Sequence, residues 1–350
     1  MMSVWAPLAL TATTGVMIAI PLAPALIEVF QRRDAGPLPT RTDDGNIRNF
    51  ARTFRAYIED LRPELAVCAE SNSIIETRLP NGAYALLVGK AGIYDVPEDT
   101  VQTLVLFARQ CSLPDGLTFT KDVYAGNLIH GGRRNSFRAL LGEDDIYLAE
   151  ESCVLRWLHA EGKIVVGQRS RMFGRASAEK AIYLSRGCSF ERMHAPAIFT
   201  SIGSELELTS DAPAVKQPAE KNLKLGRSRI NGDLHLGSGE MLLGNIIVSG
   251  SIQVDEGTRI FGSAKGNGDI HLRQQAEVQG SLVSTRTIHI ASNCSVKGPL
   301  LAEDEIIIGA GTQIGTPNSP TSVSAPRIRI APDCAVYGTL WARVEGRVEE

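Results

Sequence analysis

The chain has 350 residues, of which 36 are basic and 39 acidic, and its formal net charge is −3. This balance, without blocks of like charge, excludes a large basic footprint for nucleic acid. With 43% hydrophobic residues, only 6% aromatic residues and 33 glycines, the composition favours short strands and tight turns over a helix-packed core. The six cysteines are scattered and form no CxxC pair, which indicates free thiols in a reducing compartment.

An apolar stretch near the N-terminus, residues 4–30, carries a single charge and is long enough to cross a bilayer as a helix. Arg32 and Arg33 follow it and no basic residue precedes it, so the positive-inside rule predicts a cytoplasmic C-terminal bulk. Residues 1–33 are therefore predicted to be a single-pass anchor in a bacterial inner membrane. A cleaved signal peptide is the alternative, because small residues around Pro24 mimic a cleavage site.

The next segment combines helical and strand-like patterns. A linker rich in proline, glycine and aspartate (34–45) leads into residues 46–119, which are predicted to form a small α+β unit. Apolar residues at helical spacing predict a helix over about 47–61, and a second helix is predicted over 100–110.

Three arginines share one face of the first predicted helix: Arg48, Arg52 and Arg55. They are interpreted either as a solvated face or as a basic face lying on anionic lipid headgroups.

A repeat with a constant interval of 18 positions dominates the remainder of the chain. Its strand motif begins at Asp233, Ser251, Asp269, Thr287 and Glu305, and again at Arg327 after an insertion; upstream it begins at Asp145, Lys163 and Ala181. Side chains alternate along each strand, so every period supplies three short strands with inward apolar pairs. Stacked at about 4.8 Å, such periods form a three-faced β-helix, which is a parallel β-solenoid.

The predicted solenoid has two blocks, residues 120–203 and 225–346, separated by a loop or linker at 204–224. Glycines that recur at the same position of each turn, such as Gly262 and Gly280, mark corners where backbones approach closely. The predicted fold class is thus all-β, with an N-terminal transmembrane helix and the small α+β unit in addition.

The second block resembles the bactofilin family of polymer-forming cytoskeletal proteins. The resemblance lies in turns such as IHLRQQAEVQGSL (270–282), IHIASNCSVKGPL (288–300) and IRIAPDCAVYGTL (328–340), and it extends over about 230–345 and more loosely over 120–200. It implies a right-handed β-helix that assembles end to end without nucleotide, often at a membrane, as a scaffold for cell-envelope machinery. The implied partners are other copies of the chain, the membrane and envelope-synthesis proteins.

No catalytic, cofactor-binding or metal-binding motif emerges from the sequence. The Gly-Lys pairs lack the upstream glycine of a phosphate loop, and no HExxH, zinc-finger or EF-hand spacing occurs. An outward column of His235, Gln253, His271 and His289 is interpreted as an exposed ladder. A shared metal, or a histidine acting as an acyltransferase base, is the alternative for this column.

Two sets of residues are candidates for recognition. Arg156, Trp157, His159, Arg192 and His194 have the composition of a binding patch, although Trp157 could instead cover an edge of the first block. The final turn is expected near an exposed end and is predicted to mediate self-association through Ile328, Ile330, Val336 and Leu340.

The sequence therefore predicts a membrane-anchored, non-enzymatic β-helical scaffold that needs no cofactor. Two alternatives stay open. One is a hexapeptide-type acyltransferase on a left-handed β-helix, and the other is an exported β-helix that binds polysaccharide.

Overall fold

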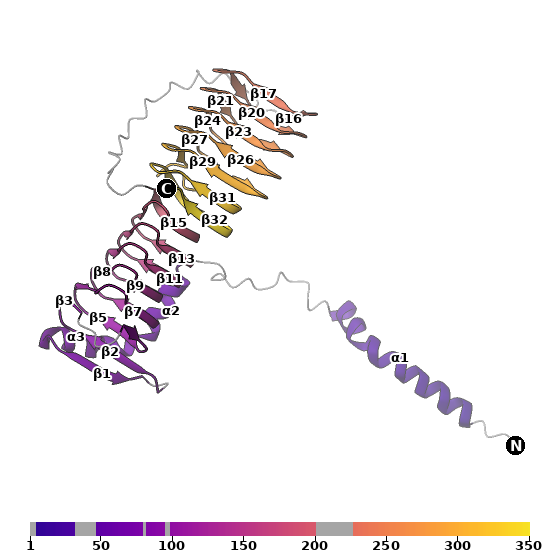
Figure 1. Ribbon diagram of the computed structural model, residues 1–350. Helices are drawn as coiled ribbons and strands as arrows, with labels where there is room; N and C mark the ends of the chain where they lie inside the picture. The colour runs from indigo at the N-terminus through magenta and orange to yellow at the C-terminus, as the bar shows by residue number, and fades with distance from the viewer. Residues whose placement is uncertain (1–4, 32–46, 80–81, 95–98, 201–226) are drawn as a thin grey trace. The chain divides into compact units, whose positions relative to one another are not determined.

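The computed structural model describes residues 5–31, 47–79, 82–94, 99–200 and 227–350. The chain divides into two units, residues 1–46 and 47–350. The predicted linkers at 34–45 and 204–224 lie outside the described residues. The first unit contains α1 (Trp5–Gln31), and the second contains the remaining helices and all the described strands (Figure 1).

The segment predicted to be a transmembrane anchor is helical, as α1. Nevertheless, within the part of the chain that the structure describes, no helix is long and apolar enough to cross a membrane. The prediction of a single-pass inner-membrane anchor is therefore wrong.

The second unit begins with two short helices, α2 (Asn49–Tyr57) and α3 (Arg62–Ser71), joined by the 3-10 helix η1 (Glu59–Leu61). The strands of the first block are β1 (Ile74–Arg78), β2 (Tyr84–Val88), β3 (Gly92–Ile93), β4 (Thr100–Val101), β5 (Leu104–Phe107), β6 (Cys111–Ser112), β7 (Thr118–Ala125), β8 (Ile129–Gly131), β9 (Ser136–Gly142), β10 (Ile146–Leu148), β11 (Cys153–Ala160), β12 (Ile164–Val166), β13 (Arg171–Ala178), β14 (Ile182–Leu184) and β15 (Ser189–Phe199).

The second block continues with shorter and more regular strands. They are β16 (Arg227–Ile230), β17 (Leu234–Leu236), β18 (Met241–Leu243), β19 (Asn245–Val248), β20 (Ile252–Val254), β21 (Arg259–Phe261), β22 (Ala264–Gly266), β23 (Ile270–Leu272), β24 (Glu277–Val278), β25 (Leu282–Ser284), β26 (Thr287–Ile290), β27 (Ser295–Val296), β28 (Leu300–Ala302), β29 (Glu305–Ile308), β30 (Gln313–Ile314), β31 (Thr321–Ile330) and β32 (Ala335–Val348).

Within each block, strands one period apart in the sequence pair in parallel and in register. In one ladder, Ile252 lies beside Ile270, which lies beside Ile288 and then Ile306, and all four side chains are fully buried. Like residues therefore stack on like residues along the axis, and the apolar ladders of the three faces meet in one continuous core. The fold is a parallel β-solenoid of about 13 turns, as the repeat predicts.

The solenoid starts earlier than predicted. β5 pairs in parallel with both β2 and β7, and β4 pairs with β7, so the strands from Tyr84 onward already belong to the stack. The boundary at residue 119 is therefore misplaced, and the helix predicted over 100–110 is instead β4 and β5. Within the first block, only β1 departs from the pattern among the described strands, because it pairs antiparallel with β2.

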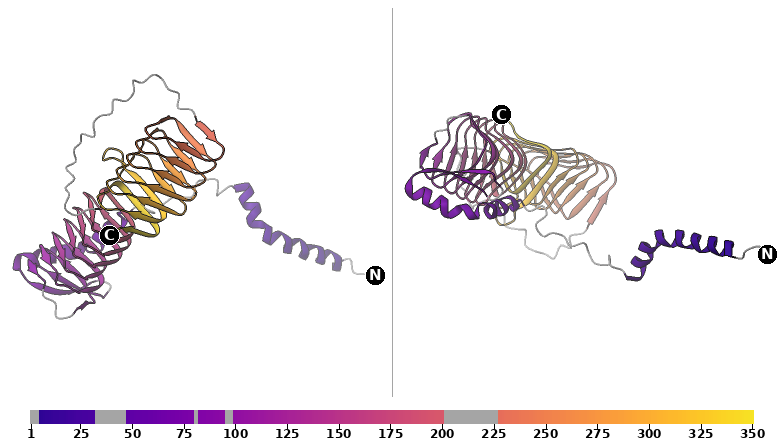
Figure 2. Two further views of the ribbon diagram at one scale, coloured as in Figure 1. Left: turned by 45° about the horizontal axis from the view of Figure 1, so that its top comes forward. Right: turned by 90° about the horizontal axis from the view of Figure 1, so that it is seen from below.

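The helices of the second unit lie against the outside of the first block (Figure 2). They bury the outward faces of β2, β5 and β7 in a second, smaller core that contains Phe54, Leu65 and Leu106. Arg55 binds Glu143 at 2.7 Å and also binds Glu161.

A second arginine on the same helical face, Arg48, binds Glu179 at 2.7 Å. The three glutamates, Glu143, Glu161 and Glu179, occupy the same position in three consecutive turns, 18 residues apart. Part of the basic helical face therefore contacts the solenoid, which neither the solvated nor the lipid-facing interpretation anticipated.

The two blocks meet end to end at a seam formed by the last strand of each, β15 and β32 (Figure 1). These strands pair antiparallel, with Phe199 opposite Ala335 at one end and Ser189 opposite Arg347 at the other. In chain order, each block is therefore built toward the seam, where its last strand lies. The sheet continues across the seam from one block into the other.

Candidate functional site

The seam buries the residues that were predicted to mediate self-association. Val336 lies opposite Ile198 and Leu340 lies opposite Met193, and Ile328 and Ile330 are fully buried in the neighbouring strand. The expectation that this turn is an exposed end is wrong, because β15 supplies the hydrogen-bonding neighbour that an end strand would lack. The sequence pattern of these four apolar residues within a single turn did not indicate that β15 would be their partner strand.

Among the described strands, the open end of the second block lies at its other extreme, β16–β18. β16, β17 and β18 each pair with one described strand only, β19, β20 and β21 respectively. Met241 and Leu243 of β18 are exposed, and Leu242 between them is half-buried. Among the described residues this end, defined here by β16–β18, combines unpaired strand edges with exposed apolar side chains.

The structure brings four of the five residues of the predicted recognition patch to one face of the first block. Trp157 and Arg192 lie on either side of Arg175, and His159 and His194 lie on either side of Ser177, all at paired positions of β11, β13 and β15.

Arg156 is exposed, whereas Trp157 is half-buried and stacks on Phe50 of α2, with ring centroids 5.8 Å apart. Trp157 belongs to a strand that is paired on both sides, with β9 and β13, so it covers no edge of the first block; its ring instead packs between the block and α2.

Arg192 and His194 of β15 lie at the seam. The guanidinium of Arg192 lies 5.1 Å from the ring centroid of Trp341 in β32. His194 Nδ1 is 2.9 Å from the Thr339 hydroxyl of the same strand. Sequence reasoning missed Trp341 and Thr339 because they belong to the other block, and Thr339 lies 145 positions beyond His194.

His159 belongs to a buried polar chain. Its Nδ1 lies 2.8 Å from Ser177 Oγ, and its Nε2 lies 3.5 Å from Glu161 Oε1. Serine, histidine and carboxylate are the groups of a nucleophilic triad, but His159 and Ser177 are each only 2% exposed, so a substrate has no path to the hydroxyl. Burial lowers the pKa of His159, which keeps the imidazole neutral as a structural bridge between strands.

The seam histidine predicts a dependence of stability on pH. Burial and the nearby Arg48 lower the pKa of His194 below its ordinary value of 6.5. The folded state therefore takes up this proton less readily than the unfolded chain, and its stability falls as pH drops below about 6.5. We expect the melting temperature to fall over this range, and His194→Gln to reduce the fall. Equal pH profiles for the two proteins would contradict this role.

The outward histidine column does not converge on a metal. The rings of His271 and His289 stack 4.8 Å apart with an interplanar angle of 12°. Parallel rings direct their nitrogens alongside one another, whereas two ligands of one ion must point at a common centre. No group of three or more potential metal-binding side chains was found among the described residues.

A carboxylate does accompany the first histidine of the column. His235 Nε2 is 2.8 Å from Asp255 Oδ2, and Gln253 Nε2 donates to Oδ1 of the same residue. The hydrogen bonds from Gln253 and His235 lower the pKa of Asp255. Asp255 lies 20 positions after His235, one turn plus two positions, and this offset is the sequence signal that could have found it.

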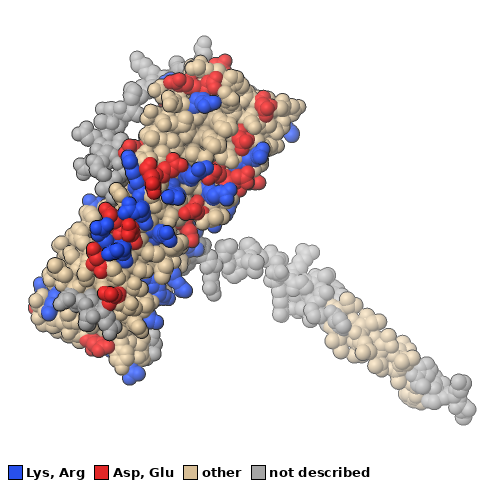
Figure 3. All heavy atoms as spheres, viewed as in Figure 1, with Lys and Arg blue, Asp and Glu red and all other residues tan. Residues whose placement is uncertain are grey.

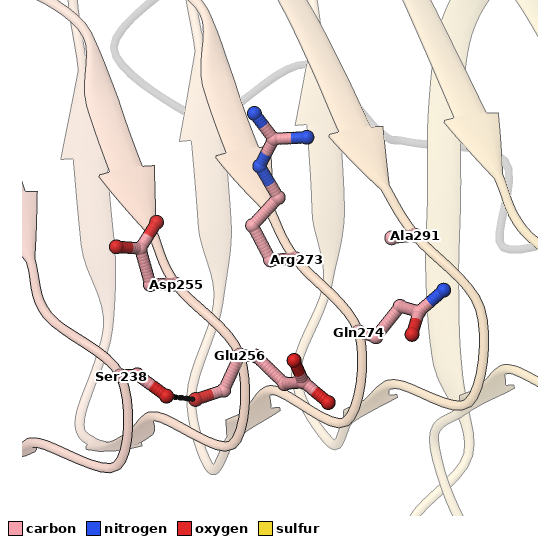
Figure 4. Close-up of a pocket in the computed structure, with 6 residues that line it drawn as sticks. All are labelled: Ser238, Asp255, Glu256, Arg273, Gln274 and Ala291. Atoms are coloured by element: carbon pink, nitrogen blue, oxygen red, sulfur yellow. Dashed lines mark hydrogen bonds between the residues drawn. The ribbon is translucent and has the colours of Figure 1, made fainter.

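A shallow groove of about 440 Å³ crosses the corners of neighbouring turns beside this column (Figure 4). It is lined by Ser238, Asp255, Glu256, Arg273, Gln274 and Ala291. Ser238 Oγ donates to the backbone carbonyl of Glu256 in the neighbouring turn (Figure 4). No histidine lines the groove, so it does not supply the base that an acyltransferase would require.

The surface charge is mixed. On the face shown in Figure 3, acidic and basic side chains alternate over both blocks and do not segregate by sign. Several form ion pairs between turns, including Arg133 with Glu150 and Arg329 with Glu305. Such pairs along a solenoid hold neighbouring turns in register but contribute little individually when exposed.

Fold and site together define the class of protein: a two-block parallel β-solenoid with a buried seam and, within its described residues, an open strand edge on the second block. Comparison of the chain with protein-family models, with curated proteins and with solved structures found no match.

Proposed function

We propose that the chain is a non-enzymatic scaffold that associates with a second copy of itself through the open end of its second block, β16–β18. The observation that supports this most directly is the set of strand edges unpaired among the described residues at that end, together with exposed Met241 and Leu243. The resemblance of the second block to polymer-forming bactofilins favours the same interpretation.

The seam within one chain provides a precedent for this contact. There, one solenoid end already pairs with another through antiparallel strands and buries apolar side chains such as Met193 and Leu340. A two-fold axis at the open end would bring the β18 strands of two copies together in the same antiparallel sense, with Met241 opposite Leu243 of the other copy.

The proposed assembly is a pair rather than a long filament. One end of the second block is covered by β15. The start of the first block also has strands with one described neighbour, β1, β3 and β4, but the antiparallel strand β1 does not match the parallel strands at β16–β18. A filament needs two complementary ends on every subunit, whereas an isologous contact through one end closes after two chains.

Light scattering on the full-length chain tests the proposal. We expect the mass of two chains at tens of micromolar, and a single chain for Leu243→Glu, because a charge at the paired edge would lose its hydration. Leu301→Glu is the matched control: Leu301 is 42% exposed on a lateral face against 50% for Leu243, and this variant should keep the two-chain mass. A monomeric wild type, or the same mass for both variants, would contradict the proposal.

A further inference from the structure

The first block begins with a strand that is paired on one side only. Among the described strands, β1 pairs with β2 alone, and the two run antiparallel from Ile74 opposite Val88 to Arg78 opposite Tyr84. β1 lies at the outer end of the block, away from the seam (Figure 1). Its second edge therefore presents backbone N–H and C=O groups to which no described strand bonds.

The register with β2 shows where the side chains of β1 point. Glu76 lies on the face of Leu86, toward the solenoid core, and so does Ile74 two positions earlier. Ile75 lies on the face of Leu87, toward the helices. A strand added to β1 would thus extend the sheet over the end of the solenoid core on one face and beside the helices on the other.

Apolar side chains are exposed at this end of the first block. Ile74 is 42% exposed and Ile75 is 37% exposed. Ile93 of β3, another strand with one described neighbour, is 80% exposed. Apolar side chains beside an unpaired strand edge are typical of a site that accepts a further strand.

Two opposite charges alternate along the core-facing side of β1. Glu76 and Arg78 are both exposed, and they lie two positions apart on the same face as Ile74. Arg78 donates to the backbone carbonyl of Gly82 at 3.3 Å and lies 5.9 Å from the ring centroid of Tyr84. Both of these partners are uncharged. Such charges oppose pairing with an arbitrary strand but favour a strand that places the opposite charges across from them.

We propose that the free edge of β1 binds an extended segment of a partner protein as an additional antiparallel strand. Antiparallel pairing is the more stable geometry. Cross-strand charge pairing requires an acidic residue opposite Arg78 and a basic residue opposite Glu76, and an apolar residue opposite Ile74 would cover it. From its N-terminal end the segment therefore has the pattern acidic, any, basic, any, apolar. Backbone hydrogen bonds supply affinity, and these alternate side chains supply specificity.

A second copy of β1 fits this edge less well than such a segment. A two-fold axis at Thr77 would place Glu76 of each copy opposite Arg78 of the other. Because β1 ends at Arg78, this register pairs only three residues of each strand and leaves Ile74 and Ile75 without a strand residue opposite. A longer segment covers both isoleucines, so we assign the edge to a different protein.

A peptide titration on the full-length chain tests the proposal. The probe is the acetylated heptapeptide amide Thr-Glu-Thr-Lys-Val-Val-Thr, labelled for fluorescence anisotropy. The control peptide, Thr-Lys-Thr-Glu-Val-Val-Thr, has the same composition and net charge but exchanges the two charged positions. We expect saturable binding of the probe, with an affinity at least about ten-fold higher than that of the control peptide.

Exchanging the charges of the protein should exchange the preference. The double variant Glu76→Lys, Arg78→Glu should bind the control peptide and lose about ten-fold or more in affinity for the probe. The matched variant Arg286→Glu, Glu303→Lys alters two exposed charges of the second block and should bind both peptides as the wild type does. Because the preference is expected to invert rather than vanish, an unfolded variant cannot imitate the result.

Alternate N-methylation of the probe tests strand pairing itself. In an antiparallel pair, every second residue directs its backbone N–H toward the partner strand. Of two probes that are methylated at the two alternate sets of residues, we expect one to bind and the other to fail. Binding through side chains alone would not distinguish them in this way.

Several outcomes would overturn the inference. They are absence of saturable binding, equal affinity for the probe and the control peptide, and equal behaviour of the two methylated probes. A lower particle mass for the double variant Glu76→Lys, Arg78→Glu in light scattering would assign the edge to a second copy, and it would overturn the inference as well. Leu243→Glu should leave peptide binding unchanged, so this inference and the proposed self-association can fail separately.

Discussion

Ile288→Asp is expected to unfold the second block. Ile288 is fully buried and lies between Ile270 and Ile306 in one apolar ladder. A carboxylate there loses its hydration, and neither neighbouring aliphatic side chain can pair with it, so the loss in unfolding free energy should exceed about 4 kcal/mol. Thermal unfolding followed by circular dichroism, together with proteolysis of residues 227–350, measures the effect.

The adjacent residue supplies the control for this change. His289 lies on the outward face of the same strand and stacks on His271, so His289→Gln should change stability by less than about 1 kcal/mol. A folded Ile288→Asp protein with wild-type melting would show that the ladder is not the source of stability. Loss of cellular function in a well-folded His289→Gln protein would show that the histidine column has a role beyond the surface.

Leu340→Asp is expected to separate the two blocks. Leu340 is fully buried opposite Met193, and a charge there faces the centre of the seam. The change should cost about 3–5 kcal/mol, concentrated at the seam rather than within either stack. We expect one cooperative thermal transition in the wild type to split into two, and the radius of gyration in small-angle X-ray scattering to rise.

Val344→Asp, in the same strand, is the matched control for the seam. Val344 is exposed, so a charge there remains hydrated and the single transition should persist. If the seam residues instead formed an end for association between chains, Leu340→Asp would lower the mass of the particle without splitting the transition. That result would contradict the pairing of β15 with β32 within one chain.

The glycine column shows how much local structure the repeat already contains. A Cβ on Gly280 would overlap the carbonyl oxygen of Gly262, and one on Gly298 would overlap the carbonyl group of Gly280. Both neighbours are backbone atoms that cannot rotate away, so the corner requires glycine in successive turns. The sequence reveals this constraint because stacking of successive repeats places identical positions in contact.

The misassigned strand at residues 104–107 shows where local pattern fails. Leu104 and Leu106 face the helices, while Val105 and Phe107 face the solenoid core, so all four side chains are buried. Burial on both faces removes the alternation that identifies a strand, and a short continuous apolar run does not distinguish strand from helix. The ambiguity arises because helices pack on the outer face of this strand, so the outward side chains are apolar as well as the inward ones.

The sequence by itself determined the period, the parallel register and the identity of the buried ladders, because each of these depends on contacts between residues one repeat apart. Only the tertiary structure decided that β15 and β32 pair antiparallel, that α2 lies along the first block, and that Arg192 meets Trp341. These contacts join segments that are distant in the chain and follow no shared period. Burial of apolar surface at the ends and flanks of the stack selects them, and that choice depends on the shapes of the assembled blocks.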